Sequence, residues 1–196
     1  MPRPPSDAKK RIVQAALKLF AARGYHNTGI ADILKESGVQ RGALYHYFSS
    51  KKELGLAAID ETVRLLAEEG AGRHLRTHGR PIDRMLKIVD DLPGVVKLQS
   101  GEALTPSVVV RLGTAEPEFS ERLSRRLSDF LDQLEAMVRR GVAEREIRES
   151  VDPRVVSCVF TVVSEGIFLM SVLGQRQAIW EDARRWLRDY VDSLRA

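Results

Sequence analysis

The chain has 196 residues, of which 43% are hydrophobic and 30% charged, a balance typical of a folded globular protein and not of a disordered one. This length allows one sizeable core, or a small domain beside a larger one, and argues against two large domains. The single cysteine, Cys158, excludes an internal disulfide framework, and no Cys/His cluster in the sequence offers a set of zinc ligands.

Positive charge is concentrated at the beginning of the chain. The formal net charge is +4, but residues 1–55 hold ten Lys/Arg against four Asp/Glu, while residues 56–196 hold 21 against 23. A local positive field suits a polyanion such as DNA, although charge alone does not separate that role from a solvated basic face. The first residues contain no apolar secretion signal, so the sequence predicts a cytoplasmic protein.

Helical periodicity runs through nearly every segment, and no alternation of apolar and polar residues is long enough for a sheet. The sequence therefore predicts an all-α fold. Ser6 is expected to cap the first helix, and Gly24 is expected to end it. Thr28 is then expected to cap a short second helix that closes at Gly38.

A third short helix is expected to run from residue 40 or 41 to Phe48. Ser50 and Glu53 stand in the S-x-x-E relation of a capping box, which predicts a long fourth helix reaching residue 70 or 72. Proline and glycine then divide the rest of the chain into further helices. The expected segments are residues 82–98, with Pro93 as a kink or an end, a short apolar helix after Pro106, and residues 117–141, 153–173 and 177–194.

The third predicted helix has two different faces. Leu44 and Phe48 lie one turn apart and point inward, while Gly42 and His46 fall on the opposite side with Tyr45 beside them. A helix this short is not stable alone, so the two helices before it must hold it. Two short helices joined by a glycine turn, the second exposing hydrogen-bonding groups in the most basic part of the chain, indicate a helix-turn-helix.

A helix-turn-helix separates phosphate contacts from base contacts. The groups suited to phosphate oxygens are the amides near the Thr28 cap and the side chains of Tyr45, Tyr47 and Lys51. The groups suited to base edges in the major groove are the side chains of Gln40, Arg41 and His46 and the backbone of Gly42. As an alternative, the two tyrosines could simply cover the core of a small bundle.

The segment GYHNTGIADILKESGVQRGALYHYFSSKKELGLAAI resembles the DNA-binding region of TetR/AcrR-type transcriptional regulators. The resemblance implies a helix-turn-helix DNA-binding domain at residues 1–55 and a helical effector-binding and dimerisation domain at residues 56–196. In the family, His often stands directly before the Phe of the third helix. Here the order is His46-Tyr47-Phe48, which leaves open which of Tyr45, His46 and Tyr47 touches a base. The phosphate contacts implied are Thr28 or Gly29, Tyr45, Tyr47 and Lys51, and the base-proximal residues implied are Gln40, Arg41, Gly42 and His46.

The last two predicted helices are expected to join two copies of the chain. Residues 155–173 are nineteen residues with one charge, Glu165, and are too apolar all round for one side of a core. A membrane span is the alternative by length, and the central Glu165 with its neighbouring hydroxyls argues against it. The dimer residues expected in the final helix recur at spacings of three and four: Trp180, Ala183, Leu187, Tyr190 and Leu194.

Arg111 and Glu165 are each a lone charge in an apolar helix, which is costly in a core unless the charge is paired. They can form a buried ion pair with each other, extend to the surface, or orient a largely apolar ligand in a cavity. The cavity residues expected are Met85, Arg111, Phe130, Leu134, Met137, Glu165 and Phe168. Cys158 is expected to be buried, and His74 and His78 are expected at a solvated helix end.

The sequence shows no Gly-rich phosphate loop, nucleophile elbow, metal-binding helix pair or carboxylate dyad, so neither an enzyme nor a cofactor is expected. The sequence and the resemblance together predict a homodimeric, ligand-responsive repressor that acts away from the membrane. It would bind double-stranded, pseudo-palindromic operator DNA and release it when a largely apolar small molecule binds. The alternative is a DNA-binding regulator of the same fold without a small-molecule effector.

Overall fold

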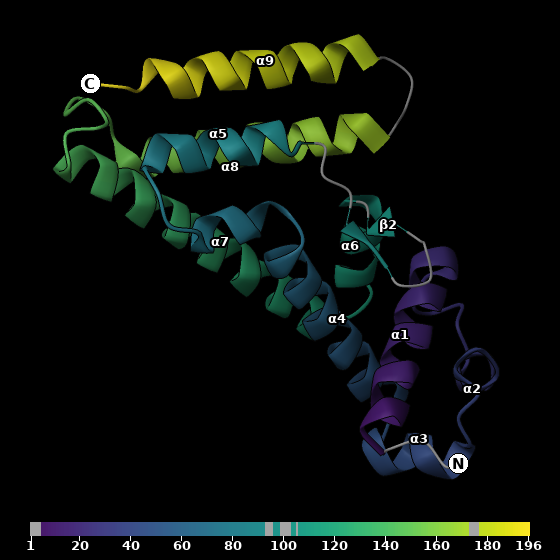
Figure 1. Cartoon of the computed structure of the whole chain (residues 1–196). Coiled ribbons are helices and arrows are strands. Elements are labelled where there is room, and N and C mark those ends of the chain that lie inside the picture. Colours follow the sequence, from purple (N-terminus) through teal and green to yellow (C-terminus); the bar gives the residue numbers. More distant parts are fainter. Residues whose placement is uncertain (1–4, 93–95, 99–102, 105, 173–176) are drawn as a thin grey trace. The chain divides into compact units, whose positions relative to one another are not determined.

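The computed structural model describes residues 5–92, 96–98, 103–104, 106–172 and 177–196 of the chain. The described residues are predominantly helical, as predicted, and their strands are a two-residue antiparallel pair, β1 (Val96–Lys97) and β2 (Ala103–Leu104) (Figure 1). Contacts divide the chain into two compact units, residues 1–65 with 96–124 (unit 1) and residues 66–95 with 125–196 (unit 2). The domain boundary at residue 55 stays a prediction.

Two helices contribute to both units. The helices of unit 1 are α1 (Pro5–Arg23), α2 (Ile30–Ser37), α3 (Arg41–Tyr47), α6 (Pro106–Gly113) and the first parts of α4 (Lys51–Glu68) and α7 (Pro117–Ala143). Unit 2 holds the remainders of α4 and α7 with the 3-10 helix η1 (Ala71–Arg76), α5 (Pro81–Asp90), α8 (Pro153–Val172) and α9 (Gln177–Ser193). α5 ends before Pro93, which lies outside the described residues, as does Leu173.

Helix ends follow some of the predicted signals and depart from others. Gly24, at φ +85°, ends α1 as predicted, but Ser6 lies inside that helix, which begins at Pro5. The hydroxyl of Ser50 accepts from the amide of Glu53 at 3.1 Å, also as predicted. The Glu53 carboxylate accepts from the amide and hydroxyl of Ser49, at 2.7 and 2.8 Å, instead of the Ser50 amide.

The beginning of α7 packs on α4 through aromatic rings in unit 1. Tyr25 makes edge-to-face contacts with Phe20 and Phe119, at centroid distances of 5.2 and 5.0 Å. Phe119 is fully buried. A Cβ at Gly55 of α4 would lie 2.3 Å from Cζ of Phe119, so a side chain at position 55 would force the ring or the helix to shift.

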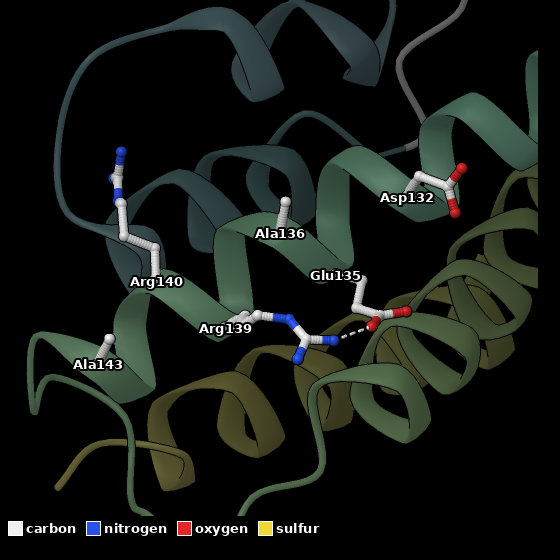
Figure 2. A pocket seen from close by; sticks show the side chains of 6 residues that line it. All are labelled: Asp132, Glu135, Ala136, Arg139, Arg140 and Ala143. Carbon is white, nitrogen blue, oxygen red and sulfur yellow. Dashed lines mark hydrogen bonds and ion pairs between the residues drawn. The ribbon is translucent and has the colours of Figure 1, made fainter.

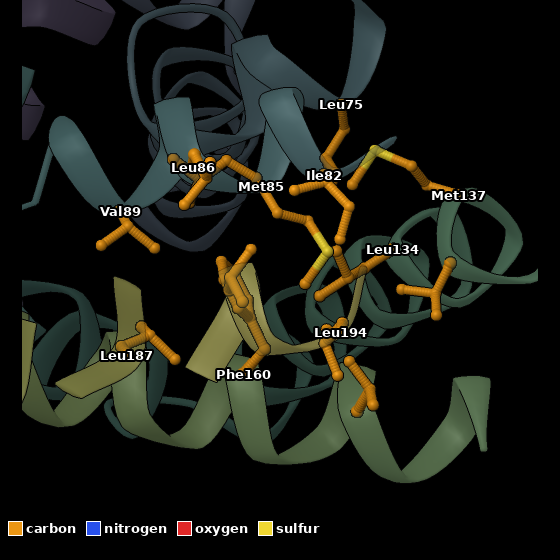
Figure 3. Close-up of a cluster of buried hydrophobic side chains, with 14 of the residues drawn as sticks. Leu75, Ile82, Met85, Leu86, Val89, Leu134, Met137, Phe160, Leu187 and Leu194 are labelled. Atoms are coloured by element: carbon orange, nitrogen blue, oxygen red, sulfur yellow. The ribbon is translucent and has the colours of Figure 1, made fainter. Parts of the chain in front are cut away.

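Side chains from α5, α7, α8 and α9 form the core of unit 2 (Figure 3). α5 is buried on most of its sides, and its buried residues include Arg84, whose guanidinium donates to the His74 and Leu75 carbonyls. At the end of the chain, the Leu194 carbonyl accepts from the Arg148 amide at 3.0 Å, and the Ala196 amide donates to Glu146 at 3.0 Å. The fully buried members of this core include Ile82, Met85, Ile88, Leu134, Phe160, Leu187 and Val191.

α8 has one buried and one exposed apolar face. Its inner face contributes Val156, Phe160 and Ile167 to the core, while Val155 and Val162 on the other side are 54% and 67% exposed. By length and composition, residues 153–171 could cross a membrane, but the core helix of a soluble protein passes the same test. One face of α8 is packed in the core of unit 2, so only its other, exposed apolar face is free for a further contact.

Candidate nucleic-acid interface and effector site

The turn between α2 and α3 depends on a glycine. Gly38 has φ +60°, a left-handed conformation that residues with a side chain rarely adopt. Its amide donates to the Leu34 carbonyl at 3.0 Å and closes α2. The neighbouring Ser37 carbonyl accepts a hydrogen bond from the Arg11 guanidinium of α1. The turn is therefore fixed both by its own backbone and by the first helix.

Two apolar side chains hold α3 in place. Leu44 is fully buried and Phe48 is 3% exposed, which confirms the predicted inner face. The Lys9 ammonium of α1 lies 5.8 Å from the centroid of the Phe48 ring. A seven-residue helix has little stability of its own, so these contacts determine the direction in which its outer face points.

The outer surface of α3 carries the predicted base-reading residues. Gln40, Arg41, Gly42 and His46 are all exposed, and a Cβ at Gly42 would meet no atom within 4 Å. A cationic fork, an amide and an imidazole on one exposed helix match the donor and acceptor pattern of base edges in the major groove.

The two tyrosines of α3 differ in environment. Tyr45 is 47% exposed, whereas Tyr47 is half-buried and its ring lies 5.0 Å from that of His46, edge to face. A packing role is therefore supported in part for the Tyr47 side chain, but hardly for the Tyr45 side chain. Which of the three aromatic side chains touches a base stays a prediction.

The Thr28 side chain is buried and hydrogen-bonded inside unit 1. It is 1% exposed, and its hydroxyl donates to the Gly24 carbonyl at 2.8 Å, which closes the turn after α1. The N-cap of α2 is Gly29, whose amide donates to the Asp32 carboxylate at 2.9 Å. The predicted cap at Thr28 is therefore wrong, because Gly29 takes that position. The phosphate contact at Thr28 or Gly29 stays a prediction, and a phosphate at the Gly29 amide would compete with Asp32.

Lys51 is half-buried at the beginning of α4. Its ammonium lies 4.4 Å from the centroid of the Tyr25 ring and 3.4 Å from the His26 carbonyl. Burial lowers the pKa of this ammonium, and the nearby Glu116 opposes the shift. A phosphate contact from Lys51 would require the ammonium to extend away from the Tyr25 ring.

Several contacts join α6 and the beginning of α7 to the helix-turn-helix within unit 1. His26 Nε2 lies 3.0 Å from the Ala115 carbonyl, and Lys52 pairs with Glu118 at 2.5 Å. The Arg111 guanidinium donates to the Ala21 carbonyl of α1. Of the alternatives for Arg111 and Glu165, a buried ion pair is wrong, because both residues are exposed. No local signal in the sequence could have shown a partner ninety residues away.

Of the predicted cavity residues, those deep in the core of unit 2 have little free surface. Met85 and Leu134 are fully buried and Met137 is 4% exposed, so all three serve as packing. Phe130 and Phe168 are half-buried, and Glu165 is exposed.

The residue that sequence reasoning missed in this region is Arg126 of α7, the main charged influence on Glu165. A signal for it existed, because Arg126 lies three residues after Leu123 and four before Phe130, on the apolar stripe of its helix.

The predicted dimer face of α9 needs correction. Leu187 and Leu194 are 0% and 2% exposed inside their own subunit, so they have no surface left for a second copy. Trp180, Ala183 and Tyr190 are half-buried against the same core. Cys158, expected to be buried, is exposed. The large exposed apolar residues of α8 and α9 are Val155, Val159, Val162, Leu169, Met170, Ile179 and Trp186.

The outer side of α7 carries a shallow depression of about 460 Å³ (Figure 2). Its lining comes from one helix, Glu135 pairs with Arg139 there, and none of the predicted effector residues takes part. The lining residues are Asp132, Glu135, Ala136, Arg139, Arg140 and Ala143.

The predicted solvated histidines differ from each other. His74 is 13% exposed and its Nε2 contacts the Asp91 carboxylate, so the prediction is wrong for this residue, whereas His78 is exposed. Asp91 also pairs with Arg73 at 2.6 Å. In the part of the chain that the structure describes, no group of three or more His, Cys, Asp or Glu residues could hold a metal ion.

Two segments of the chain match descriptions of one protein family. Residues 12–58 match bacterial regulatory proteins of the tetR family, and residues 100–187 match the tetracyclin repressor-like C-terminal domain. The uncharacterized HTH-type transcriptional regulator YxaF of Bacillus subtilis (strain 168) is 41% identical over 61 residues, which cover 31% of this chain and 32% of that relative. The aligned segment thus spans about a third of that relative's length.

Solved structures with the same fold cover nearly the whole chain. A TetR transcriptional regulator from Chloroflexus aurantiacus J-10-FL has a TM-score of 0.81 at 23% identity, with 97% of each chain covered. The regulator FadR from Bacillus subtilis, solved in complex with stearoyl-CoA, has a TM-score of 0.71 at 18% identity, with 93% of this chain and 96% of FadR covered. At these identities the likeness concerns the fold alone.

Proposed function

Because the chain belongs to the TetR family of bacterial regulatory proteins, we propose that this DNA-binding transcriptional regulator is a repressor that releases its operator when a small molecule binds in unit 2. The family consists of transcriptional regulators, not of enzymes. A protein with this role meets its operator in the bacterial cytoplasm.

The observation that carries the DNA-binding role is the exposed polar face of α3. Arg41 and Gln40 extend from a helix whose direction is fixed by buried Leu44 and Phe48. In this proposal, Gln40, Arg41 and His46 approach base edges in the major groove, and Gly42 lets the backbone come close. Phosphate contacts come from Tyr45, Lys51 and the exposed edge of Tyr47, and they supply affinity without sequence preference.

The exposed apolar face of α8 and α9 supports a homodimer. Val162 is 67% exposed and Trp186 is 53% exposed, on two helices that pack against each other, and exposed apolar surface of this kind often marks a protein interface. Two copies joined by these helices would be related by a two-fold axis. Their two α3 helices would then read the two halves of a pseudo-palindromic site, about one or more helical turns apart.

An effector site in unit 2 is supported by the half-buried Phe130 and Phe168 and by the opposite charges of Arg126 and Glu165, which influence each other. Stearoyl-CoA, bound by the structural neighbour FadR, shows that a protein of this fold can hold a ligand with a long apolar part. A ligand that favours a dimer arrangement incompatible with DNA would shift the population towards release.

An electrophoretic mobility shift with DNA from the protein's own promoter region tests the regulator role. We expect a shift with that DNA that survives an excess of random DNA and is lost on Arg41→Ala. A shift that random DNA removes completely, or one that is unchanged in Arg41→Ala, would contradict base reading by α3.

The alternative is the same fold without a small-molecule effector. A candidate ligand that raises thermal stability in a saturable way and releases DNA over the same concentration range supports ligand control. Saturable stabilisation with DNA binding unchanged favours the alternative.

A further inference from the structure

Glu165 of α8 is one of two opposite charges of unit 2 that have similar surroundings. Its side chain is exposed to solvent, yet burial is the largest influence on its carboxyl and raises the pKa. Arg126 of α7 has the same character, since it is half-exposed and burial lowers the pKa of its guanidinium.

These two opposite charges influence each other without pairing. The Glu165 carboxylate raises the pKa of the Arg126 guanidinium, and the guanidinium lowers the pKa of the carboxyl. Among the described residues, however, no hydrogen bond or ion pair joins them. The Arg126 Nε is buried and has no hydrogen-bond partner. Its guanidinium carbon lies 5.6 Å from the centroid of the Phe130 ring, so one face of the cation rests on an aromatic surface.

Ser164, next to Glu165, has a second unsatisfied group. The buried hydroxyls one and two turns earlier on α8 donate to backbone carbonyls of their own helix, Ser157 to Pro153 at 2.7 Å and Thr161 to Ser157 at 2.8 Å. Ser164 is 9% exposed, but its Oγ has no hydrogen-bond partner in the part of the chain that the structure describes. Buried polar groups in native proteins are normally paired, so two unpaired groups, the Arg126 Nε and the Ser164 Oγ, are available to a ligand.

We propose that Arg126, Ser164 and Glu165 bind the polar head of the effector, and that this head carries no net charge. The head presents a hydrogen-bond acceptor to Arg126 and a donor to Glu165, with Ser164 supplying a further hydroxyl contact. The inference rests on the proposed ligand-responsive function and names the chemical class of its ligand.

The donor and acceptor properties of the three side chains determine this class. A guanidinium only donates, an ionised carboxylate only accepts, and a hydroxyl does both. A carboxylate head would be attracted by Arg126 and repelled by Glu165. An ammonium head would be attracted by Glu165 and repelled by Arg126. A primary amide is the simplest head that satisfies both, with its carbonyl oxygen on Arg126 and its N–H on Glu165. The apolar body of the ligand then extends along Phe130.

Three probes with one apolar chain and different heads test the proposal: decanamide, decanoate and decyltrimethylammonium. Binding of each to the full-length protein without DNA is measured by titration calorimetry. We expect decanamide to bind about tenfold or more tightly than either ion, because a hydrogen bond to a charged group contributes about that factor. Equal affinity for all three probes, or binding of none, would overturn the proposal.

Variants of the two charges sharpen the test. Arg126→Met leaves Glu165 alone and should move the preference to the cationic probe, while Glu165→Gln should move it to decanoate. Arg139→Met on the exposed side of α7 and Glu149→Gln are matched controls that should keep the wild-type order. Ser164→Ala should weaken decanamide without changing the order. If Arg126→Met does not fold, the shift in Glu165→Gln alone decides, and an unchanged order there refutes the head-group assignment.

A failure of the proposed function would look different. Decanamide bound with the expected selectivity but without operator release would leave the head-group site standing and contradict ligand control. Operator release by all three probes at equal concentrations would support ligand control and contradict the head-group site.

Discussion

The contact between Gly55 and Phe119 offers a double-variant test of the packing in unit 1. An ideal Cβ at Gly55 lies 2.3 Å from Cζ of Phe119 and 3.0 Å from Cε2 of Tyr25, and the Phe119 ring is fully buried. Overpacking costs about 1–3 kcal/mol, while replacing a glycine inside a helix by alanine gains about 1 kcal/mol. Gly55→Ala alone should therefore lower the free energy of unfolding by about 0–2 kcal/mol.

Removing the ring should reverse the sign of the alanine effect. Phe119→Ala should cost about 3–5 kcal/mol, because it deletes a fully buried aromatic side chain. In the double variant, the added methyl group enters the vacated space and the helix gain remains, so the total loss should be about 2–4 kcal/mol. The two changes should thus be non-additive by about 1–3 kcal/mol, the size of the clash.

Urea unfolding followed by far-UV circular dichroism measures all four proteins. Gly42→Ala is the matched control, because a Cβ there meets no atom within 4 Å and the change should be neutral or stabilising. Effects of Gly55→Ala and Phe119→Ala that add within about 0.5 kcal/mol would refute the contact, since distant sites behave that way.

Three further predictions concern DNA and assembly. Gly42→Val should abolish specific DNA binding without lowering thermal stability. Binding that is retained in a mobility shift would show that the Gly42 side of α3 does not face the major groove. Lys51→Met should weaken binding to all DNA sequences and lower the slope of log affinity against log salt concentration by about 1. Arg41→Ala or Gln40→Ala should instead change the preference among operator variants. Equal losses on random and operator DNA in all three variants would contradict this separation of phosphate and base contacts. Val162→Arg should dissociate the proposed homodimer in sedimentation, and a dimer that persists would contradict an interface on α8.

Local signals in the sequence predicted the frame of the DNA-reading part. Gly24 and Gly38 end their helices because backbone conformation at positive φ depends on the residue itself. Leu44 and Phe48 were identified from a spacing of four within one short helix. The same kind of local reasoning failed for Thr28, because its hydroxyl can cap the following helix or donate back to Gly24, and both choices are available to the same local sequence.

The second half of the chain shows what periodicity leaves undetermined. A helix that is apolar on all sides, such as α8, does not reveal which side its own subunit covers, and Cys158 was therefore assigned to the wrong side. Leu187 shares the spacing of an interface residue and yet lies in the core. Arg111 and Glu165 looked alike in sequence, but their surroundings come from different units, and only the folded chain separates them.

The open space around Gly42 also affects how such a protein can diverge. Because no atom lies within 4 Å of its missing Cβ, a side chain added there changes what α3 offers to DNA without disturbing the core beneath it. Gln40 and Arg41 are exposed in the same way. Mutations at these positions therefore change DNA binding much more than stability. Operator preference can thus differ between related proteins that keep the same fold.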